Sequence, residues 1–335
     1  MRIAVIHNAL QADSGLDEQD VLAQAETVTD ALRELGHKPV RLTCGLNLSR
    51  IQSELRSIGP DMVFNLVESL DGTGRLIHLF PSLLDAMALP YTGACAEAMM
   101  LTSNKLLAKA MLDGAGLPTP VWITPRKTCG PGLFRRPREN PRRWIIKSVW
   151  EHASVGLDAE AIVEASSDQG LDAVLTERRP RLGGDCFAEA FIEGREFNLS
   201  LLDGGDGPQV LPPAEIIFEG YAADQARIVD YKAKWEADSY EYHHTPRRFD
   251  FDAADEGLLE QLRTLALECW ELLGLRGYAR VDFRVDQHAR PWILEINANP
   301  CLSPDAGFAA AVHQAGMSMT EAIGRIVEAG MSGLT

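Results

Sequence analysis

The first hundred residues combine short apolar runs with stretches of helical periodicity. Apolar runs at residues 3–6, 40–43 and 61–66 predict buried strands. Between the first two, apolar positions recur at helical spacing from Val21 to Leu35, and Gly36 is placed to end that helix. A second helix is predicted from Leu76 to Met87. Strands that alternate with helices in this way predict a parallel sheet with helices on its faces.

The middle of the chain is interrupted by breaker residues. A helix is predicted near residues 103–112 and ends at Asp113 and Gly114. Residues 124–143, rich in Pro, Arg and Gly, predict an irregular, exposed connection. Strands are predicted at 144–149 and 186–191, with a loop at 151–156 and a helix around 168–179 between them.

Strand signals dominate from Glu196 onward, interrupted by one long helix with leucines at 258, 262, 265, 272 and 273. The segments YARVDFRV and PWILEIN are the strongest of these strand signals. A chain of this length is expected to fold as several compact units. The predicted units are residues 1–100, 101–187 and 188–335.

Composition narrows the class of protein. A formal net charge of −16 argues against nucleic acid or an anionic membrane surface as the partner. No segment is apolar enough to span a bilayer, and the N-terminal MRIAVIHN does not have the pattern of a signal peptide. The six cysteines include no CxxC pair, which disfavours a zinc knuckle or a disulfide framework. We therefore expect a cytoplasmic protein, and a homodimer is compatible with the sequence.

Polar residues alternate with apolar ones in the two strongest predicted strands. Alternation places Arg280 and Asp282 on one face of the first strand, and Glu295 and Asn297 on one face of the second. If the strands pair as a hairpin, three oxygen ligands and a guanidinium converge. Two carboxylates and an amide oxygen suit Mg²⁺, and Mn²⁺ would fit the same ligands. The alternative is a surface hairpin with solvated charges, which the apolar residues between the polar ones disfavour.

Two lysines and several acidic residues precede this hairpin. Lys147 interrupts the apolar strand WIIKSVW and therefore needs an anionic partner, either a nucleotide phosphate or a buried acid. Lys105 lies near a helix start, where a lysine is usually solvated. The loop EHASVG, with Ser154 and Gly156, could place backbone N–H groups over phosphates. Acidic residues in FAEAFIEGREF, at 189, 193 and 196, could accept from an adenine amine or from ribose hydroxyls.

The order of these features resembles the ATP-grasp superfamily, and most closely the D-alanine–D-alanine ligases. NKLLAKAMLDGAGLPTP, WIIKSVWEHASVGL, EAFIEGREF, DYKAKW and RVDFRVD with LEINANP resemble consecutive motifs of that family. The resemblance covers about residues 85–305. It implies an α/β fold with an N-terminal Rossmann-like parallel-sheet domain, a small α+β lid lobe and a C-terminal α+β lobe. It also implies an ATP-dependent ligase that joins a carboxylate to an amine, such as two amino acids, through an acyl phosphate.

The same resemblance implies roles for individual residues. Phosphates would contact Lys105, Lys147 and Ser154, the Ile192 backbone would bind the adenine ring edge, and Glu189 and Glu196 would bind the adenine amine and the ribose. The Mg²⁺ ions would be held by Asp282, Glu295 and Asn297. Lys234 and Arg280 would face the transferred phosphoryl group. Substrate contacts would come from Glu18, Glu68, Trp235 and Ser303.

Several positions depart from the family pattern. His152 and Ala153 stand where the loop usually has glycine and serine, Trp235 replaces a tyrosine, and Cys301 replaces a glycine. The acidic residue near the first helix could also be Asp17 or Asp20 instead of Glu18. Because these changes fall where amino acids would bind, the ATP chemistry is better defined than the substrates. A small-molecule kinase and a nucleotide-binding regulator with a degenerate site are the alternative functions.

Overall fold

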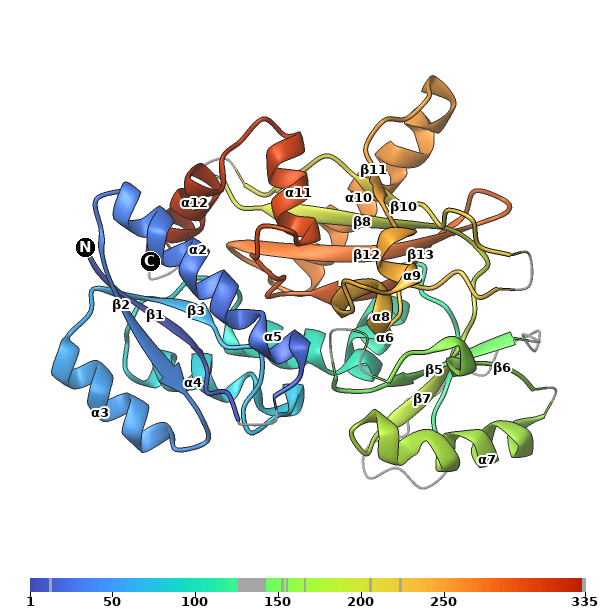
Figure 1. Ribbon diagram of the computed structural model, residues 1–335, viewed down its shortest axis with the longest axis horizontal. Helices are drawn as coiled ribbons and strands as arrows, with labels where there is room; N and C mark the ends of the chain where they lie inside the picture. Colours follow the sequence, from blue (N-terminus) through green and yellow to red (C-terminus); the bar gives the residue numbers. More distant parts are fainter. Residues whose placement is uncertain are drawn as a thin grey trace.

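In the computed structural model, the described part of the chain folds into three sheets with helices packed against them (Figure 1). The described residues are 1–11, 14–125, 143–151, 154, 156–165, 167–204, 207–222 and 225–332. The irregular connection predicted at 124–143 lies almost entirely outside them. Within these ranges, no helix combines the length and apolar character needed to cross a membrane.

The N-terminal sheet is parallel, as the alternating pattern predicts, with strand order β2-β1-β3. One face packs against α2, and the other face packs against α3 and α4. Gly36 follows α2 with a φ of +77°, a left-handed conformation that glycine adopts without strain. The helices α1, α3 and α5 were not predicted. The bounds are β1 (Arg2–Asn8), α1 (Leu16–Gln19), α2 (Val21–Glu34), β2 (Lys38–Cys44), α3 (Leu48–Ile58), β3 (Met62–Leu66), η1 (Gly74–Leu76), α4 (Leu79–Ala86) and α5 (Ala96–Ser103).

The second sheet is antiparallel, with order β4-β7-β5-β6, and α7 covers one of its faces (Figure 1). Helix α6 leads into it and begins at Lys105, because the Asn104 side chain caps it by accepting from the N–H groups of Leu106 and Leu107. The bounds are α6 (Lys105–Gly114), β4 (Trp122–Ile123), β5 (Arg143–Ser148), η2 (Ala159–Ala161), β6 (Ile162–Glu164), α7 (Asp168–Arg178), η3 (Arg179–Leu182) and β7 (Cys186–Ala190).

The third sheet is the largest, with order β11-β10-β8-β12-β13 and β9 paired with β8. Helices α5, α6 and α10 pack on one side of it. Helices α11 and α12 share a core with α2 and the N-terminal sheet, so the end of the chain lies beside its beginning (Figure 1). The bounds are β8 (Gly194–Leu202), β9 (Gln209–Val210), β10 (Ala214–Ile216), α8 (Tyr231–Trp235), α9 (Tyr240–His243), β11 (Arg247–Arg248), η4 (Ala253–Asp255), α10 (Glu256–Leu272), β12 (Tyr278–Asp286), β13 (Pro291–Asn297), α11 (Gly307–Gln314) and α12 (Met319–Ser332).

The division of the chain into three units at residues 100 and 187 stays a prediction. Residue 100 lies within α5 and residue 187 within β7. Because a boundary is expected in a linker that few contacts cross, we propose that the divisions fall in the neighbouring loops. For the second division, that loop is residues 191–193, between β7 and β8.

Candidate active site

A cavity of about 650 Å³ is lined by residues from both antiparallel sheets, from α6 and α8, and from two loops of the N-terminal unit. It gathers most of the residues that the sequence singles out, although they span more than 200 positions of the chain. Concave sites of this size commonly bind small molecules. The predicted site residues that line it are Glu68, Lys105, Lys147, Ser154, Glu189, Ile192, Glu196, Lys234, Trp235, Arg280, Asp282, Glu295 and Asn297.

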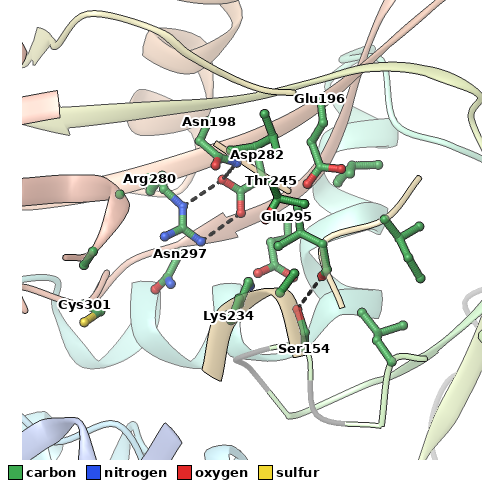
Figure 2. A pocket seen from close by; sticks show the side chains of 18 of the residues that line it. Ser154, Glu196, Asn198, Lys234, Thr245, Arg280, Asp282, Glu295, Asn297 and Cys301 are labelled. Carbon is green, nitrogen blue, oxygen red and sulfur yellow. Dashed lines mark hydrogen bonds and ion pairs between the residues drawn. The ribbon is translucent and has the colours of Figure 1, made fainter. Parts of the chain in front are cut away.

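The predicted hairpin of β12 and β13 forms one wall of the cavity. The strands are antiparallel, with Asp282 opposite Glu295 and Arg280 opposite Asn297. Directly opposed residues share a face of the sheet, so these four side chains lie together, as Figure 2 shows. Asp282 accepts hydrogen bonds from Arg280, at 2.8 and 3.0 Å, and from Asn198 of β8, at 2.8 Å.

The donor set on this wall fits Mg²⁺. Asp282, Glu295 and Asn297 offer two carboxylates and one amide oxygen, and Mg²⁺ completes such a set with water and phosphate oxygens. No group of three or more His, Cys, Asp or Glu arranged for a metal occurs in the described ranges. Two carboxylates and an amide leave coordination positions that water or phosphate oxygens would fill.

Two cations face these carboxylates. Burial alone would lower the pKa of Arg280, but Asp282 raises it above its usual value. Lys234, in the short helix α8, has its pKa lowered by burial and by the nearby Arg280, although Glu295, Asp282 and Glu196 oppose the shift. The arrangement places positive charge beside the predicted metal ligands, where an incoming anion would be neutralised.

Lys105 is buried, although lysines near a helix start are usually solvated. Its side chain is only 8% exposed, and Nζ donates to the backbone oxygen of Glu151 at 2.6 Å and lies 3.8 Å from Oε2 of Glu295. Burial lowers its pKa. A buried lysine of this kind needs compensation by anions, which Glu295 provides in part and a phosphate would complete.

Lys147 shares the carboxylate of Glu189 with a third lysine that sequence reasoning missed. Oε1 of Glu189 accepts from Lys147 at 2.5 Å, and Oε2 accepts from Lys109 at 2.6 Å. Glu189 and Lys109 are each 1% exposed. The signal in the sequence was the spacing of four residues between Lys105 and Lys109, which places both on one face of α6. Lys147 thus has the buried acidic partner that was one of its two predicted options.

Glu196 also has an unforeseen partner. Arg284 of β12 lies 2.8 Å from its Oε2, and its guanidinium also donates to the backbone oxygens of Gly194 and Arg227. Gly194, the first residue of β8, approaches β12 so closely that a Cβ would lie 2.0 Å from the Val285 oxygen. Only glycine fits there. Burial raises the pKa of Glu196 in spite of Arg284.

The predicted phosphate loop contacts the rest of the site through its described residues. Ser154 Oγ donates to the backbone oxygen of Val229 at 2.9 Å, a bond visible in Figure 2. Thr73, from the N-terminal unit, donates to Oε1 of Glu151 at 3.2 Å. His152 and Ala153, two of the departures from the family pattern, lie outside the described residues. The loop is therefore held from both sides of the cavity.

An acidic group of residues closes the end of the cavity nearest the N-terminal unit. Of the three candidate acids, Asp20 lines the cavity and accepts from Ser303 Oγ at 2.8 Å and from Cys301 Sγ at 2.9 Å. Gln24 donates to Glu68 at 2.8 Å. Burial raises the pKa of Glu68 to about 7, with Asp20 and Asp17 adding to the effect.

The other two acids near the first helix lie elsewhere. Asp17 accepts from the hydroxyl of Tyr231 at 2.8 Å. Glu18 and Ser303 are not among the described residues that line the cavity. Of the three acids near the first helix, Asp20 is the one that lines the cavity within the described residues, and Ser303 contacts Asp20. The roles of Glu18 and Ser303 in substrate binding stay predictions.

The chain is similar to known proteins over most of its length. Residues 143–328 match the family described as "D-ala D-ala ligase C-terminus". In sequence, "Uncharacterized protein y4sG" of Sinorhizobium fredii is 30% identical over 313 residues, covering 91% of this chain and 86% of that protein. A D-alanine–D-alanine ligase of Aquifex aeolicus is 27% identical, covering 98% of this chain and 100% of that protein.

Solved structures give the same result for the fold. The D-alanine–D-alanine ligase from Bacillus anthracis complexed with ATP has a TM-score of 0.73 at 19% identity, covering 100% of this chain and 98% of that chain. The ligase from Coxiella burnetii has a TM-score of 0.71 at 18% identity, covering 100% and 94%. The predicted ATP-grasp fold is confirmed. Because the family match spans more than half of the 335 residues, the chain belongs to the D-alanine–D-alanine ligase family of ATP-grasp ligases.

Proposed function

We propose that the protein uses ATP and Mg²⁺ to join the carboxylate of one small molecule to the amine of another, with amino acids as the substrate class. The observation that carries this proposal is the gathering of four cations around one cavity with Asp282, Glu295 and Asn297. These four are the cations that the sequence predicts for the site, namely Lys105, Lys147, Lys234 and Arg280, and Arg247 and Arg284 line the same cavity. The relatives named as D-alanine–D-alanine ligases support amino acids as the substrates.

The nucleotide would lie along the wall between the two antiparallel sheets. Lys105 and Lys147 would contact its phosphates, the Ile192 backbone the adenine edge, and Glu196 the ribose. Glu189 would accept from the adenine amine with lone pairs that its two lysines leave available. Mg²⁺ held by Asp282, Glu295 and Asn297 would neutralise charge on the phosphates. Charge neutralisation and positioning are the main sources of acceleration in phosphoryl transfer.

The proposed reaction has two displacement steps. A carboxylate oxygen of the first substrate forms a bond to the γ-phosphorus while the bond to the bridging oxygen breaks, and ADP leaves. The amine nitrogen of the second substrate then bonds to the acyl carbon, the bond from that carbon to the phosphate oxygen breaks, and the nitrogen gives up a proton to the departing phosphate or to solvent. Arg280 and Lys234 are placed to stabilise the negative charge that develops in both steps.

Water must be kept from the acyl phosphate, because it hydrolyses readily. The loop around Ser154 is the candidate lid. Its bonds to Val229 and, through Glu151, to Thr73 attach it to both sides of the cavity. A closing loop of this kind excludes water and completes the site when substrates are bound.

The test is a screen of amino-acid pairs, D and L, for phosphate release from ATP, with mass detection of the products. The proposal expects phosphate release that requires both substrates and an amide in the product. ADP formation with a single substrate and a stable phosphorylated product would assign a kinase. Nucleotide binding without turnover by any pair would assign a regulator instead.

A further inference from the structure

Three charged side chains in the wall behind the phosphate site form a buried group with a net charge of +1. They come from three elements: Lys109 from α6, Lys147 from β5 and Glu189 from β7. Each carboxylate oxygen of Glu189 accepts from one lysine, at 2.6 and 2.5 Å. Lys109 is 1% exposed and does not line the cavity within the described residues, whereas Lys147 does.

Lys109 has a second bond that fixes its position. Its Nζ donates to Thr119 Oγ1 at 2.8 Å, and that hydroxyl donates in turn to the backbone oxygen of Ile293 on β13 at 3.0 Å. Lys109 is therefore attached to both antiparallel sheets. Burial lowers its pKa to about 8. Burial alone would raise the pKa of Glu189, but the two lysines together hold it below its usual value.

The net charge of this group determines whether Lys147 can bind an anion in the cavity. A carboxylate paired with a single buried lysine would hold that lysine with both oxygens, and the pair would be neutral. With Lys109 on Oε2, Glu189 is already neutralised, so the charge of Lys147 is available to an anion in the cavity. A buried ion pair that exposes one extra cation suits a phosphate site better than a closed neutral pair.

We propose that Lys109 is a positioning residue for nucleotide binding: it occupies one oxygen of Glu189 and thereby keeps the charge of Lys147 available to the ATP phosphates. This inference rests on the proposed function, because it takes Lys147 to contact phosphate. Lys109 itself touches no part of the nucleotide. Lys109 affects the affinity for ATP through Glu189, whereas Lys105 and Lys147 would contact the phosphates directly.

The test measures the Kd of ATP by calorimetry for the whole chain, with thermal unfolding in parallel. Lys109→Met should weaken ATP binding about tenfold, because Glu189 would then carry an uncompensated charge that binds Lys147 and withdraws it from the phosphates. Lys109→Met in the Glu189→Gln background should change the Kd by less than about threefold, because the carboxylate that captures Lys147 is gone.

Thr119→Val is the matched control. It removes the hydroxyl partner of Lys109 and leaves all three charges, so it should lower the unfolding temperature and leave the Kd of ATP unchanged. If Lys109→Met does not fold, Lys109→Gln keeps a hydrogen-bond donor for folding but not the positive charge that neutralises Glu189, so it should show the same weakening of about tenfold.

Two results would overturn the inference. One is an unchanged Kd in the single Lys109 variant, and the other is a weakening of equal size with and without the Glu189 carboxylate, which would mean that Lys109 acts on the nucleotide directly. Failure of the wild-type chain to bind ATP is a separate outcome. It would refute the proposed function, and with it the basis of the inference.

Discussion

Asp282 and Glu295 lie opposite each other on β12 and β13, with both carboxylates on the face of the sheet that lines the cavity. Two carboxylates held this close repel each other unless cations lie between or beside them. Arg280 supplies one such cation to Asp282, and Lys105 lies 3.8 Å from Glu295. A bound divalent cation would neutralise the charge of both carboxylates at once.

The first prediction concerns these metal ligands. Asp282→Asn or Glu295→Gln should reduce turnover by at least about 100-fold, because the loss of an anionic ligand weakens Mg²⁺ where phosphoryl charge is neutralised. Folding should survive, since both residues border a cavity. The measurement is ADP release at increasing Mg²⁺ concentration, with thermal unfolding. Asp286→Asn, at the turn end of β12, is the control. Turnover within about tenfold of wild type would exclude the two carboxylates from catalysis.

The hairpin was predictable because its signal is local. Residues two apart in a strand share a face, so the sequence alone places Arg280 with Asp282 and Glu295 with Asn297. The partners that sequence reasoning missed are remote: Lys109 and Glu189 are separated by 80 positions, and Asn198 and Asp282 by 84. The periodicity of apolar and polar residues along a sequence does not indicate which remote residues pair. That Asp20 lines the cavity, and Glu18 does not, depends on how the start of α2 packs against the loop after β13, which is likewise a tertiary property.

The second prediction concerns Lys147. Lys147→Ala should weaken ATP binding and lower kcat together, because the lost cation serves the phosphates in both the ground state and the transition state. Because Glu189 keeps its ion pair with Lys109 in this variant, the free energy of unfolding should fall only modestly. The measurements are the Kd of ATP, kcat and thermal unfolding. A sharp fall in stability with an unchanged Kd would make Lys147 purely structural.

The third prediction concerns the pH dependence of stability. Burial raises the pKa of Glu68 from about 4.5 to about 7. Between these values the folded chain binds more protons at this group than the unfolded chain, so the free energy of unfolding should fall as pH rises from about 4.5 to 7. The contribution is at most about 3 kcal/mol.

Glu68→Gln should remove this part of the slope, because the amide does not titrate and can still accept from Gln24. The measurement is denaturant unfolding of both proteins at pH 5, 6, 7 and 8. Relative to wild type, the variant should gain stability toward pH 8. Parallel curves would show that Glu68 is charged throughout this range.

The fourth prediction concerns the bond between Tyr231 and Asp17, which joins α8 to the N-terminal unit across 214 positions of the chain. A hydrogen bond to a carboxylate contributes about 1.5–3 kcal/mol. Tyr231→Phe should therefore weaken the attachment of α8 to the N-terminal unit and admit water to the site, so that more phosphate is released than amide is formed. Tyr240→Phe, whose hydroxyl donates to the Glu219 backbone, is the control. An unchanged ratio of phosphate to amide would show that this bond does not seal the site.

The last prediction concerns the substrates. Trp235 lines the cavity where the family usually has a tyrosine, and Ala153 stands where its loop usually has a serine. Neither residue carries a hydroxyl, so a hydrogen bond between two hydroxyls at these positions cannot form. At the far end of the cavity, Asp20 is occupied by Ser303 and by Cys301, which stands in place of the usual glycine. Changes in buried polar partners can alter substrate preference by orders of magnitude. We therefore predict that D-alanine with D-alanine is not the best pair, and that a bulkier or differently charged partner is preferred. The measurement compares kcat/KM for D-alanine self-condensation with that of the best pair from the amino-acid screen. If D-alanine alone gives the highest value, at about 10⁴ M⁻¹s⁻¹ or more, the substituted positions do not set the specificity and the chain is a cell-wall dipeptide ligase.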